Sequence, residues 1–427
     1  MIHINLITDN FDNTLNALLK RNLDKDKLKE NLEKVVSLNE NRKNIQQKND
    51  DLKSQINDFS SKIGALYKSG KQNEAEAMKN EVSELKNTSK EYEEALKDIV
   101  IEMEDILIAI PNIPNELVPF GTNAADNLIY KDWEKPLPVL NENAQPHWDL
   151  AKKYNIIDFE LGAFITGSGF PLYRGKGAKL ERALINFFLD EADKAGYEEI
   201  IPPLMVNEDS ARATGQLPDK EGQMYFVEKD NLYLIPTAEV PLTNIYRDRI
   251  LNENELPVKV TGHTPCFRRE AGSYGADVKG LNRVHQFDKI EIVQITTQEE
   301  SYVSLVKMVE HVENILLKLE LPFRIVRLCG GDLGFTSAIT YDFEVYSAAQ
   351  KRWLEVSSVS NFETFQANRL KLRYKDSNGK IKLAHTLNGS ALALARIVAA
   401  ILENNQTEDG IKIPDILKKY LNFEKID

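Results

Sequence analysis

Cysteine is almost absent from this sequence. Its 427 residues include only Cys266 and Cys329, too few for a disulfide framework and too few, by themselves, for a structural zinc site. The scattered histidines show no metal-ligand spacing, so no zinc is expected. A chain this poor in cysteine is typical of a reducing compartment, and we expect a cytoplasmic protein.

Long hydrophobic runs are also missing. None reaches the roughly 18 to 20 residues that span a bilayer, and the stretch IVIEMEDILIAI (99–110) is interrupted by acids. The first residues, MIHINLITDNFDN, lack the basic and apolar regions of a secretory signal. We therefore expect no membrane association.

The chain has no overall excess of positive charge, since its formal net charge is −12. That value argues weakly against nucleic-acid binding, which depends on cationic patches. The charge is unevenly distributed, however. Residues 21–73 carry 12 Lys/Arg against 8 Asp/Glu, whereas residues 74–105 carry 4 against 11. The sequence is therefore compatible with a localised cationic face despite its negative total charge.

The N-terminal quarter contains apolar residues at heptad spacing, from Leu28 to Leu66 and again from Ala75 to Ile106. This pattern predicts an antiparallel coiled-coil hairpin over about 28–106, with Gly70 in its turn. The seam does not reveal what the outer faces contact, so a plain dimerisation coil and a partner-binding arm both remain open. The proline-rich segment PNIPNELVP (111–119) divides the chain into predicted domains 1–110 and 111–427.

Beyond this linker, strand-like runs follow one another with few long helices between them. They cover residues 231–240, 288–296, 323–328, 341–348 and 352–360. Residues 370–387 form a predicted β-hairpin with Asn378-Gly379 as its turn. The fold class predicted is α+β, an antiparallel sheet with flanking helices rather than a doubly wound parallel sheet.

Three segments carry a family resemblance. HTPCFRREAGSYGADVKGLNRVHQFDKIEIV (within 262–293) resembles motif 2 of class II aminoacyl-tRNA synthetases, TLNGSALALARIVAAILENNQ (386–406) resembles motif 3, and the helix–strand segment 179–203 resembles motif 1. With these motifs in order, and with MVNEDSARATGQLP, the triplet TAE and WLEVSSVSNFETFQANR, the chain is similar to bacterial-type seryl-tRNA synthetases along nearly its whole length.

The resemblance implies a class II catalytic sheet preceded by a tRNA-binding hairpin. The implied activity is that of a serine–tRNA ligase, which forms seryl-adenylate and pyrophosphate from L-serine and ATP. The seryl group then passes to the 3′-terminal adenosine of serine tRNA, and a selenocysteine tRNA is a further candidate substrate. The resemblance also implies Mg²⁺ on the ATP phosphates and a homodimer formed through motif 1.

Site residues follow from the same resemblance. Arg268 and Glu270 lie two apart, so on a strand both would project to one face. The catalytic residues implied are Arg268 and Arg396. Implied serine ligands are Thr237, Glu239, Arg268, Glu291 and Ser390. Implied ATP ligands are Arg268, Arg269, Glu270, Val284, Phe287, Glu355, Val356, Ser357, Ser358 and Arg396, with Glu355 and Ser358 holding Mg²⁺. Alanine should be rejected because it would leave Glu291 buried and unpaired.

Departures from the family pattern occur at Ala391, Asn368 and Phe362. None is a residue with an implied role. Two other functions stay open on the residues: a related ligase that loads a carrier protein, and a non-enzymatic scaffold. The long hairpin counts against the first. The intact set of charged site residues counts against the second.

Overall fold

The computed structural model describes residues 1–219, 222–270 and 279–427. The chain divides into two compact units. The first contains Met1–Leu19 and Leu23–Pro111, and the second contains Lys20–Asn22 and Asn112–Asp427.

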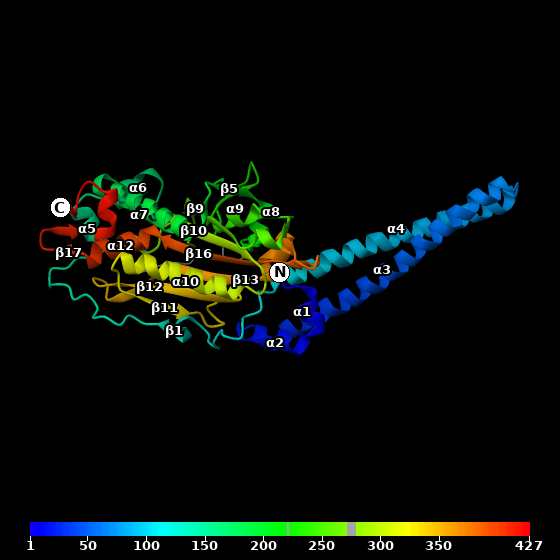
Figure 1. Ribbon diagram of the computed structural model, residues 1–427, viewed down its shortest axis with the longest axis horizontal. Helices are drawn as coiled ribbons and strands as arrows, with labels where there is room; N and C mark the ends of the chain where they lie inside the picture. The colour runs from blue at the N-terminus through cyan, green and yellow to red at the C-terminus, as the bar shows by residue number, and fades with distance from the viewer. Residues whose placement is uncertain (220–221, 271–278) are drawn as a thin grey trace. The chain divides into compact units, whose positions relative to one another are not determined.

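The first unit is helical. Two short helices, α1 (Ile4–Asp9) and α2 (Phe11–Leu19), precede the long pair α3 (Lys25–Lys68) and α4 (Gln72–Ala109), which run side by side in Figure 1. The Asp24 side chain begins α3 by accepting a hydrogen bond from the Lys27 amide at 2.8 Å. Gly70 lies in the turn with a φ of +77°, a conformation that glycine adopts without a Cβ penalty. The predicted helical hairpin is confirmed.

The seam between α3 and α4 is mostly apolar, with one buried polar contact. Leu28, Val35, Val82 and Ile99 are buried along it. The Ser89 hydroxyl also lies in the seam and donates a 2.7 Å hydrogen bond to Oδ1 of Asn49. Because both side chains are buried, any slip of one helix past the other would leave polar atoms unpaired. This contact therefore favours one register of the hairpin.

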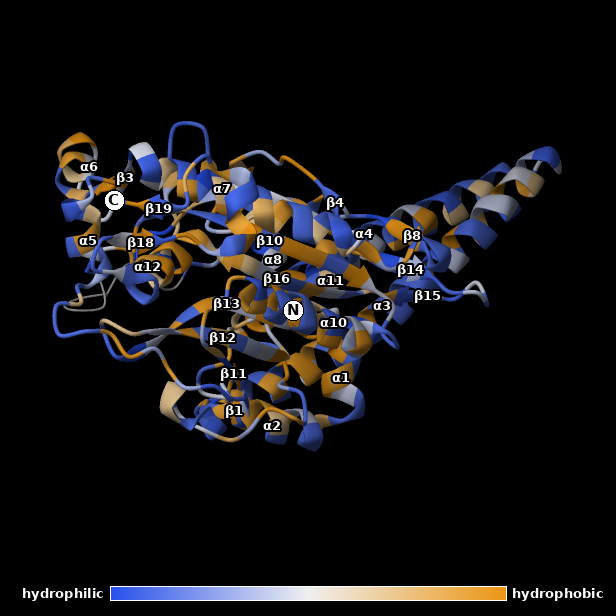
Figure 2. Ribbon diagram, turned by 60° about the vertical axis from the view of Figure 1, so that its left-hand side comes forward, coloured by the Kyte–Doolittle hydropathy of each residue, from blue (hydrophilic) through white to orange (hydrophobic). Residues whose placement is uncertain are grey.

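The second unit is built on an eight-stranded sheet with the order β1-β11-β12-β13-β16-β10-β9-β4. The strands are β1 (Leu128–Lys131), β11 (Phe323–Arg327), β12 (Ile339–Ser347), β13 (Arg352–Glu363), β16 (His385–Ala393), β10 (Gln286–Thr296), β9 (Val258–Phe267) and β4 (Glu198–Glu199). Neighbours are antiparallel except that β4 is parallel to β9. The central strands are largely hydrophobic in Figure 2, whereas the hairpin is largely hydrophilic.

Three helices pack on this sheet and close its core. They are α7 (Gly175–Lys194), α10 (Ser301–Lys318) and α12 (Leu394–Asn404). Smaller helices are α5 (His147–Lys153), α6 (Phe159–Ile165), α8 (Glu208–Thr214), α9 (Glu239–Asn244) and α11 (Thr364–Leu370). Short 3₁₀ turns cover Ala124–Asp126, Glu253–Glu255 and Asp415–Tyr420. Among the described residues, none of the helices has the length and apolarity required to cross a bilayer.

Four small sheets surround the large one. One has two strands, β2 (Ile157–Asp158) and β3 (Leu172–Tyr173). The second contains β5 (Met205–Asn207), β6 (Phe226–Val227) and β7 (Leu232–Leu234), and the third contains β8 (Ile250–Asn252), β14 (Arg373–Lys375) and β15 (Ile381–Leu383). The fourth contains β17 (Gln406–Thr407), β18 (Gly410–Lys412) and β19 (Lys425–Ile426).

The α+β prediction is confirmed, and two local predictions need correction. The predicted strand 231–240 ends at Leu234, and Glu239 begins helix α9. The turn between β14 and β15 has five residues rather than two, because the Asp376 carboxylate accepts hydrogen bonds from the amides of Asn378 and Lys380. Gly379 occupies the left-handed position of this turn, with a φ of +80°.

Candidate active site

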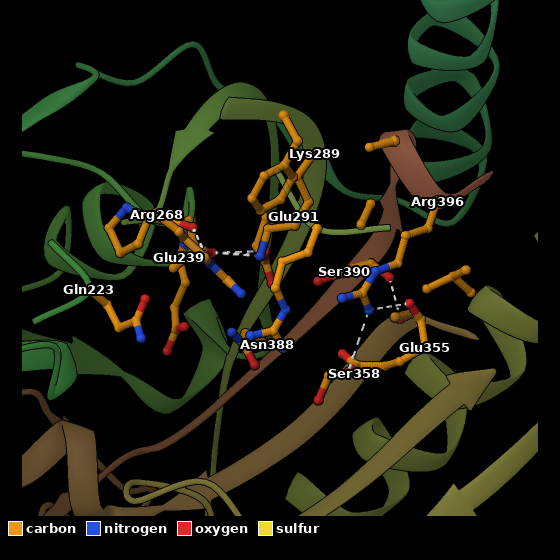
Figure 3. A pocket seen from close by; sticks show the side chains of 18 of the residues that line it. Gln223, Glu239, Arg268, Lys289, Glu291, Glu355, Ser358, Asn388, Ser390 and Arg396 are labelled. Carbon is orange, nitrogen blue, oxygen red and sulfur yellow. Dashed lines mark hydrogen bonds and ion pairs between the residues drawn. The ribbon is translucent and has the colours of Figure 1, made fainter. Parts of the chain in front are cut away.

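A cavity of about 480 Å³ opens on the large sheet of the second unit. Figure 3 shows charged and polar side chains converging on it from β10, β13, β16 and α12. The cavity is lined by every predicted site residue but one: Thr237, Glu239, Arg268, Glu270, Val284, Phe287, Glu291, Glu355, Val356, Ser357, Ser358, Ser390 and Arg396. Residues from four separate stretches of sequence therefore meet in one place.

Arg269 is the exception. Its guanidinium lies over the Tyr225 ring, 5.4 Å from the ring centroid, and its backbone amide donates to the Gln223 carbonyl at 2.9 Å. It does not line the cavity. The two neighbouring arginines therefore lie in different surroundings.

Glu291 and Ser390 lie opposite each other on β10 and β16. Glu291 is only 1% exposed, and its carboxylate forms an ion pair with Lys289, which is also buried. Thr237 joins the same cluster: its hydroxyl donates to Oε2 of Glu291 at 2.9 Å and accepts from Nζ of Lys289 at 2.9 Å. Oε1 of Glu291 has no hydrogen-bond partner among the described residues. One carboxylate oxygen is therefore available to a small donor.

The sequence prediction missed Lys289 as a site residue. The alanine-rejection argument changes accordingly, because Glu291 keeps Lys289 and Thr237 as partners even without substrate. A substrate that lacks a hydroxyl would leave only one oxygen unpaired instead of an entire carboxylate. The sequence did contain a signal for Lys289: it lies two residues before Glu291 on β10, so both side chains project from the same face of the strand.

Glu239 is a second buried acid at this end of the cavity. Burial, reinforced by the nearby Glu291 carboxylate, raises the pKa of Glu239 to about 7. The Gln366 amide opposes this shift by donating a 2.6 Å hydrogen bond to Oε1 of Glu239. A bound ammonium group would favour the ionised carboxylate in the same way.

Arg268 and Glu270 both line the cavity, but not through the strand geometry expected. Strand β9 ends at Phe267, and Glu270 has a left-handed φ of +47°. Glu270 forms a 3.2 Å ion pair with Arg283. The Arg268 guanidinium lies 5.4 Å from the centroid of Phe287, and its Nε donates to the Pro236 carbonyl at 3.3 Å. The turn after β9, rather than alternation along it, brings the two side chains to the cavity.

Arg396 comes from the first turn of α12 and lies at the other end of the cavity. Its Nε donates to the Asn282 carbonyl at 2.9 Å, and its Nη1 lies 3.7 Å from Oε2 of Glu355. Figure 3 shows Arg396, Glu355 and Ser358 gathered together, apart from the cluster around Glu291. The cavity thus has a buried, carboxylate-rich end and a more open end around Arg396.

Comparisons with known proteins agree along the whole chain. Residues 1–114 match the model of the seryl-tRNA synthetase N-terminal domain, and residues 225–405 match the class II core domain of tRNA synthetases for G, H, P, S and T. A serine–tRNA ligase of Salinibacter ruber is 49% identical over 92% of each chain, and one of Hydrogenobaculum is 45% identical over 100% of each. The chain belongs to the seryl-tRNA synthetase family.

Solved structures agree with this family assignment. The seryl-tRNA synthetase of Pyrococcus horikoshii, solved with ATP, is 32% identical, and the match covers 100% of this chain and 99% of that one with a TM-score of 0.92. The cytoplasmic serine–tRNA ligase of Naegleria fowleri, solved with AMP, is 26% identical with a TM-score of 0.87 and covers 100% of this chain and 99% of that one. Both family domains are therefore present in this seryl-tRNA synthetase family member.

A buried network that the sequence did not reveal supports the open end of the cavity. Nδ1 of His147 lies 2.7 Å from Oε1 of Glu403, and Nε2 of His147 accepts a 2.8 Å hydrogen bond from the Leu281 amide. The neutral tautomer with its proton on Nδ1 satisfies both contacts. Asn282, which accepts from Arg396, directly follows Leu281. This network fixes the backbone at Leu281 and Asn282, which in turn holds Arg396. Its members, His147 and Glu403, are too far apart in sequence to form a motif.

The oxygen atoms of Glu355 and Ser358 are suited to a hard cation such as Mg²⁺. The Glu355 side chain is 51% exposed, so its oxygens are open to solvent and to ligands. Asp342 faces Ser358 across β12 and β13. The described residues contain no cluster of three metal-binding side chains, so any ion here would need oxygens from substrate or water.

The three family departures occupy different surroundings. Phe362 lines the cavity, whereas Ala391 is fully buried in the hydrophobic core of the second unit. Asn368 lies on α11 and does not line the cavity. Phe362 is therefore the departure with direct access to a bound substrate.

Proposed function

We propose that this chain activates L-serine with ATP and transfers the seryl group to the 3′-terminal adenosine of serine tRNA. The observation that carries the proposal is the pairing of Glu291 with Ser390 at the bottom of a cavity that also contains Arg268 and Arg396. A small hydroxylated amino acid meets polar partners at the closed end, and a nucleotide meets arginines and an aromatic ring.

The first reaction requires positioning more than proton transfer. A carboxylate oxygen of serine attacks the α-phosphorus of ATP, the bond to the bridging oxygen of the β-phosphate breaks, and pyrophosphate leaves. Arg268 binds the α-phosphate and the serine carboxylate, so its fixed charge stabilises the negative charge that develops in the transition state. Its guanidinium lies 5.4 Å from the centroid of the Phe287 ring, beside a proposed wall of the adenine site.

The closed end selects serine. Oε1 of Glu291 accepts a hydrogen bond from the substrate hydroxyl, and Ser390 contacts the same hydroxyl. Glu239 and Thr237 lie around the substrate ammonium group. Lys289 neutralises Glu291, and we assign it a positioning role that keeps one carboxylate oxygen turned toward the substrate.

The open end binds ATP. The adenine ring lies between Phe287 and Arg396, with Glu270 and the Val284 backbone at its edge. The segment Glu355–Ser358 borders the phosphates, including Val356 and Ser357. Glu355 and Ser358 would hold Mg²⁺, which when bound would offset phosphate charge. Arg269 joins the phosphates only if its side chain leaves Tyr225.

The ribose hydroxyl of tRNA then attacks the carbonyl carbon of seryl-adenylate and releases AMP. We assign tRNA recognition to the α3–α4 hairpin, and serine tRNA is the primary substrate proposed, with selenocysteine tRNA as a second. Charging assays with purified tRNA of each kind decide between one substrate and two.

We also propose a homodimer formed around motif 1. Ile201, which follows β4, is 88% exposed, and Phe164 and Ile165 on α6 are 86% and 65% exposed. Large apolar side chains at such exposure are typical of protein interfaces. Sedimentation of the unmodified chain should give a dimer, and Ile201→Asp should shift it toward monomer.

The two buried, unbonded cysteines support a cytoplasmic location.

Serine-dependent exchange of label between pyrophosphate and ATP tests the central step. Pure protein should exchange with serine and magnesium but not without serine. Absence of exchange would overturn the proposed activity and favour a scaffold. Exchange without charging of any tRNA would instead favour a ligase that loads another carrier.

A further inference from the structure

The two flanks of the α3–α4 hairpin have opposite charge. In each helix the seam residues occupy positions a and d of a heptad, so positions e and b lie on one side of the seam and positions c and g on the other. Leu28 and Val35 are a positions in α3, and Ala75 and Val82 are a positions in α4. Every residue of both helices is described, so both flanks are complete.

Two ion pairs between the helices confirm which positions share a flank. Lys53 pairs with Glu93 at 2.8 Å, and both residues occupy e positions. Lys34 pairs with Glu102 at 2.7 Å, and both occupy g positions. The e and b positions of α3 and α4 therefore lie on one side of the hairpin, and the g and c positions lie on the opposite side.

All lysines of α4 lie on the first of these sides. Lys79, Lys86, Lys90 and Lys97 follow one another at spacings of 7, 4 and 7 residues. Lys97 lies 18 positions after Lys79, which is about five helical turns, so the four side chains form one line along the helix. They are exposed, and they form no ion pair or hydrogen bond with another described residue. Their charges are therefore free to act on a ligand.

Helix α3 extends this line. Lys43 and Lys53 occupy the b and e positions that face the same way, and Lys43 is also exposed, with no ion pair or hydrogen bond to any residue that the structure describes. Together these residues define the lysine flank: Lys43, Lys53, Lys79, Lys86, Lys90 and Lys97. Its acids between these lysines are Glu93, which pairs with Lys53, and Asp50, which accepts a hydrogen bond from Gln46 at 2.9 Å.

The opposite flank is acidic. From residue 81 to 105, every charged residue at positions g and c of α4 is an acid. These acids are Glu81, Glu84, Glu91, Asp98, Glu102 and Asp105. The lysines on this side are partly neutralised, since Lys34 pairs with Glu102 and Lys62 with Asp58 at 2.6 Å. The acidity of α4 is therefore confined mainly to one side of the hairpin.

We propose that the lysine flank binds the phosphate backbone of the tRNA and that the acidic flank turns the polyanion away from the other side. The inference rests on the proposed function and specifies its tRNA-binding surface. Both helices contribute, although α4 has a net negative charge. A row of unpaired lysines along some five turns matches the regular charge of a nucleic-acid backbone.

This arrangement orients tRNA as well as attracting it. Phosphates that bind the lysine flank release their condensed counterions, which favours binding, whereas phosphates that approach the acidic flank are repelled by like charge. The Debye length is about 8 Å at physiological salt, so each flank acts mainly on groups close to it. Attraction on one side and repulsion on the other give the arm a preferred face.

A matched pair of triple variants tests the proposal in the full chain. One variant combines Lys86→Gln, Lys90→Gln and Lys97→Gln on the lysine flank. The control combines Lys34→Gln, Lys48→Gln and Lys62→Gln on the acidic flank. Both remove three positive charges from the same arm, and lysine and glutamine have similar helix propensities. Circular dichroism checks that the helices persist.

Serine tRNA is the probe, and its affinity is measured at several salt concentrations. The lysine-flank variant should raise the dissociation constant and the KM for tRNA about tenfold or more and lower the slope of log affinity against log salt by about 2 to 3. The control should stay within about twofold. Serine-dependent pyrophosphate exchange should be unchanged in both.

Equal losses in the two variants would overturn the proposal, because net charge alone would then explain binding. Wild-type affinity in the lysine-flank variant would also overturn it. In both cases the proposed function stands as long as the unmodified chain charges tRNA. Failure of the unmodified chain to bind any tRNA would refute the flank and the tRNA half of the function together.

Discussion

The hairpin and the large sheet place their charges in contrasting environments. On the hairpin, Lys79, Lys86 and Lys90 are exposed and form no ion pair or hydrogen bond within the described part of the chain. In the cavity, Lys289 and Glu291 are almost fully buried and bind each other as well as Thr237. Exposed charges act on an extended polyanion through summed, salt-dependent attraction. Buried charges act on one small ligand through a few fixed contacts.

The difference shows why the same residue type serves two purposes in this chain. Loss of one exposed lysine removes one contact of several. Loss of Lys289 leaves a buried carboxylate without its counterion, which affects both folding and binding.

Arg268→Ala should lower the rate of pyrophosphate exchange about 100- to 1000-fold, because a fixed charge at the reacting phosphate is lost. The exchange rate of Arg268→Lys should lie between those of Arg268→Ala and the wild type, since an ammonium keeps the charge but lacks the planar, two-pronged geometry of the guanidinium. Arg212→Ala is the control. Arg212 pairs with Glu208 at 2.6 Å outside the cavity lining and should matter less than about twofold. An Arg268→Ala rate within tenfold of wild type would contradict its role.

Lys289→Met should destabilise the protein by about 3 to 5 kcal/mol, because Glu291 is left buried without its counterion. Its kcat/KM for serine in exchange should fall about 100-fold, equivalent to about 2.7 kcal/mol. Thermal unfolding and exchange assays measure the two effects. The double variant Lys289→Met/Glu291→Leu should recover most of the stability but none of the serine activity. Wild-type stability in the single variant would show that the ion pair is absent.

Glu239 makes serine binding dependent on pH. Its pKa near 7 means that the carboxylate ionises as pH rises through neutrality. The substrate ammonium favours the ionised form, so the KM for serine should fall about tenfold between pH 6 and pH 8. Glu239→Gln should raise KM and remove this dependence. A pH profile unchanged by Glu239→Gln would assign the titration to another group.

Ser89→Ala should leave Oδ1 of Asn49 without its buried partner and destabilise the hairpin by about 1 to 3 kcal/mol. Hydrogen exchange of the α3 and α4 amides measures this local effect. The double variant Asn49→Leu/Ser89→Ala should restore protection, since both polar groups are replaced. Pyrophosphate exchange should not change in either variant. A lowered exchange rate would show that the two units are not energetically separable.

Local periodicity predicts some parts of this molecule much better than others. The heptads from Leu28 to Ile106 predicted the hairpin because each helix buries a repeating stripe against its neighbour. Glu291 and Ser390 lie opposite each other on β10 and β16, and the resemblance to the family motifs predicted both as site residues. Lys289 was overlooked although it shares the face of Glu291. The His147–Glu403 network had no sequence signal, because its partners come from distant segments.

Turns were the least predictable elements. Arg268 and Glu270 reach the cavity through a left-handed residue after β9, not through strand alternation. Asp376 lengthens the turn expected at Asn378-Gly379 by binding backbone amides. Each case depends on a conformation or side-chain contact that residue spacing alone does not specify.

Shortening the hairpin tests the separation of the two regions most directly. Removing three heptads from each helix, residues 42–62 and 78–98, keeps the seam in phase and the turn intact while deleting the whole lysine flank. Pyrophosphate exchange with serine and charging of serine tRNA are then measured on the same preparation. Exchange should stay within about twofold of wild type, whereas charging should fall at least about 100-fold. Equal loss of both activities, or full charging by the shortened chain, would contradict the account.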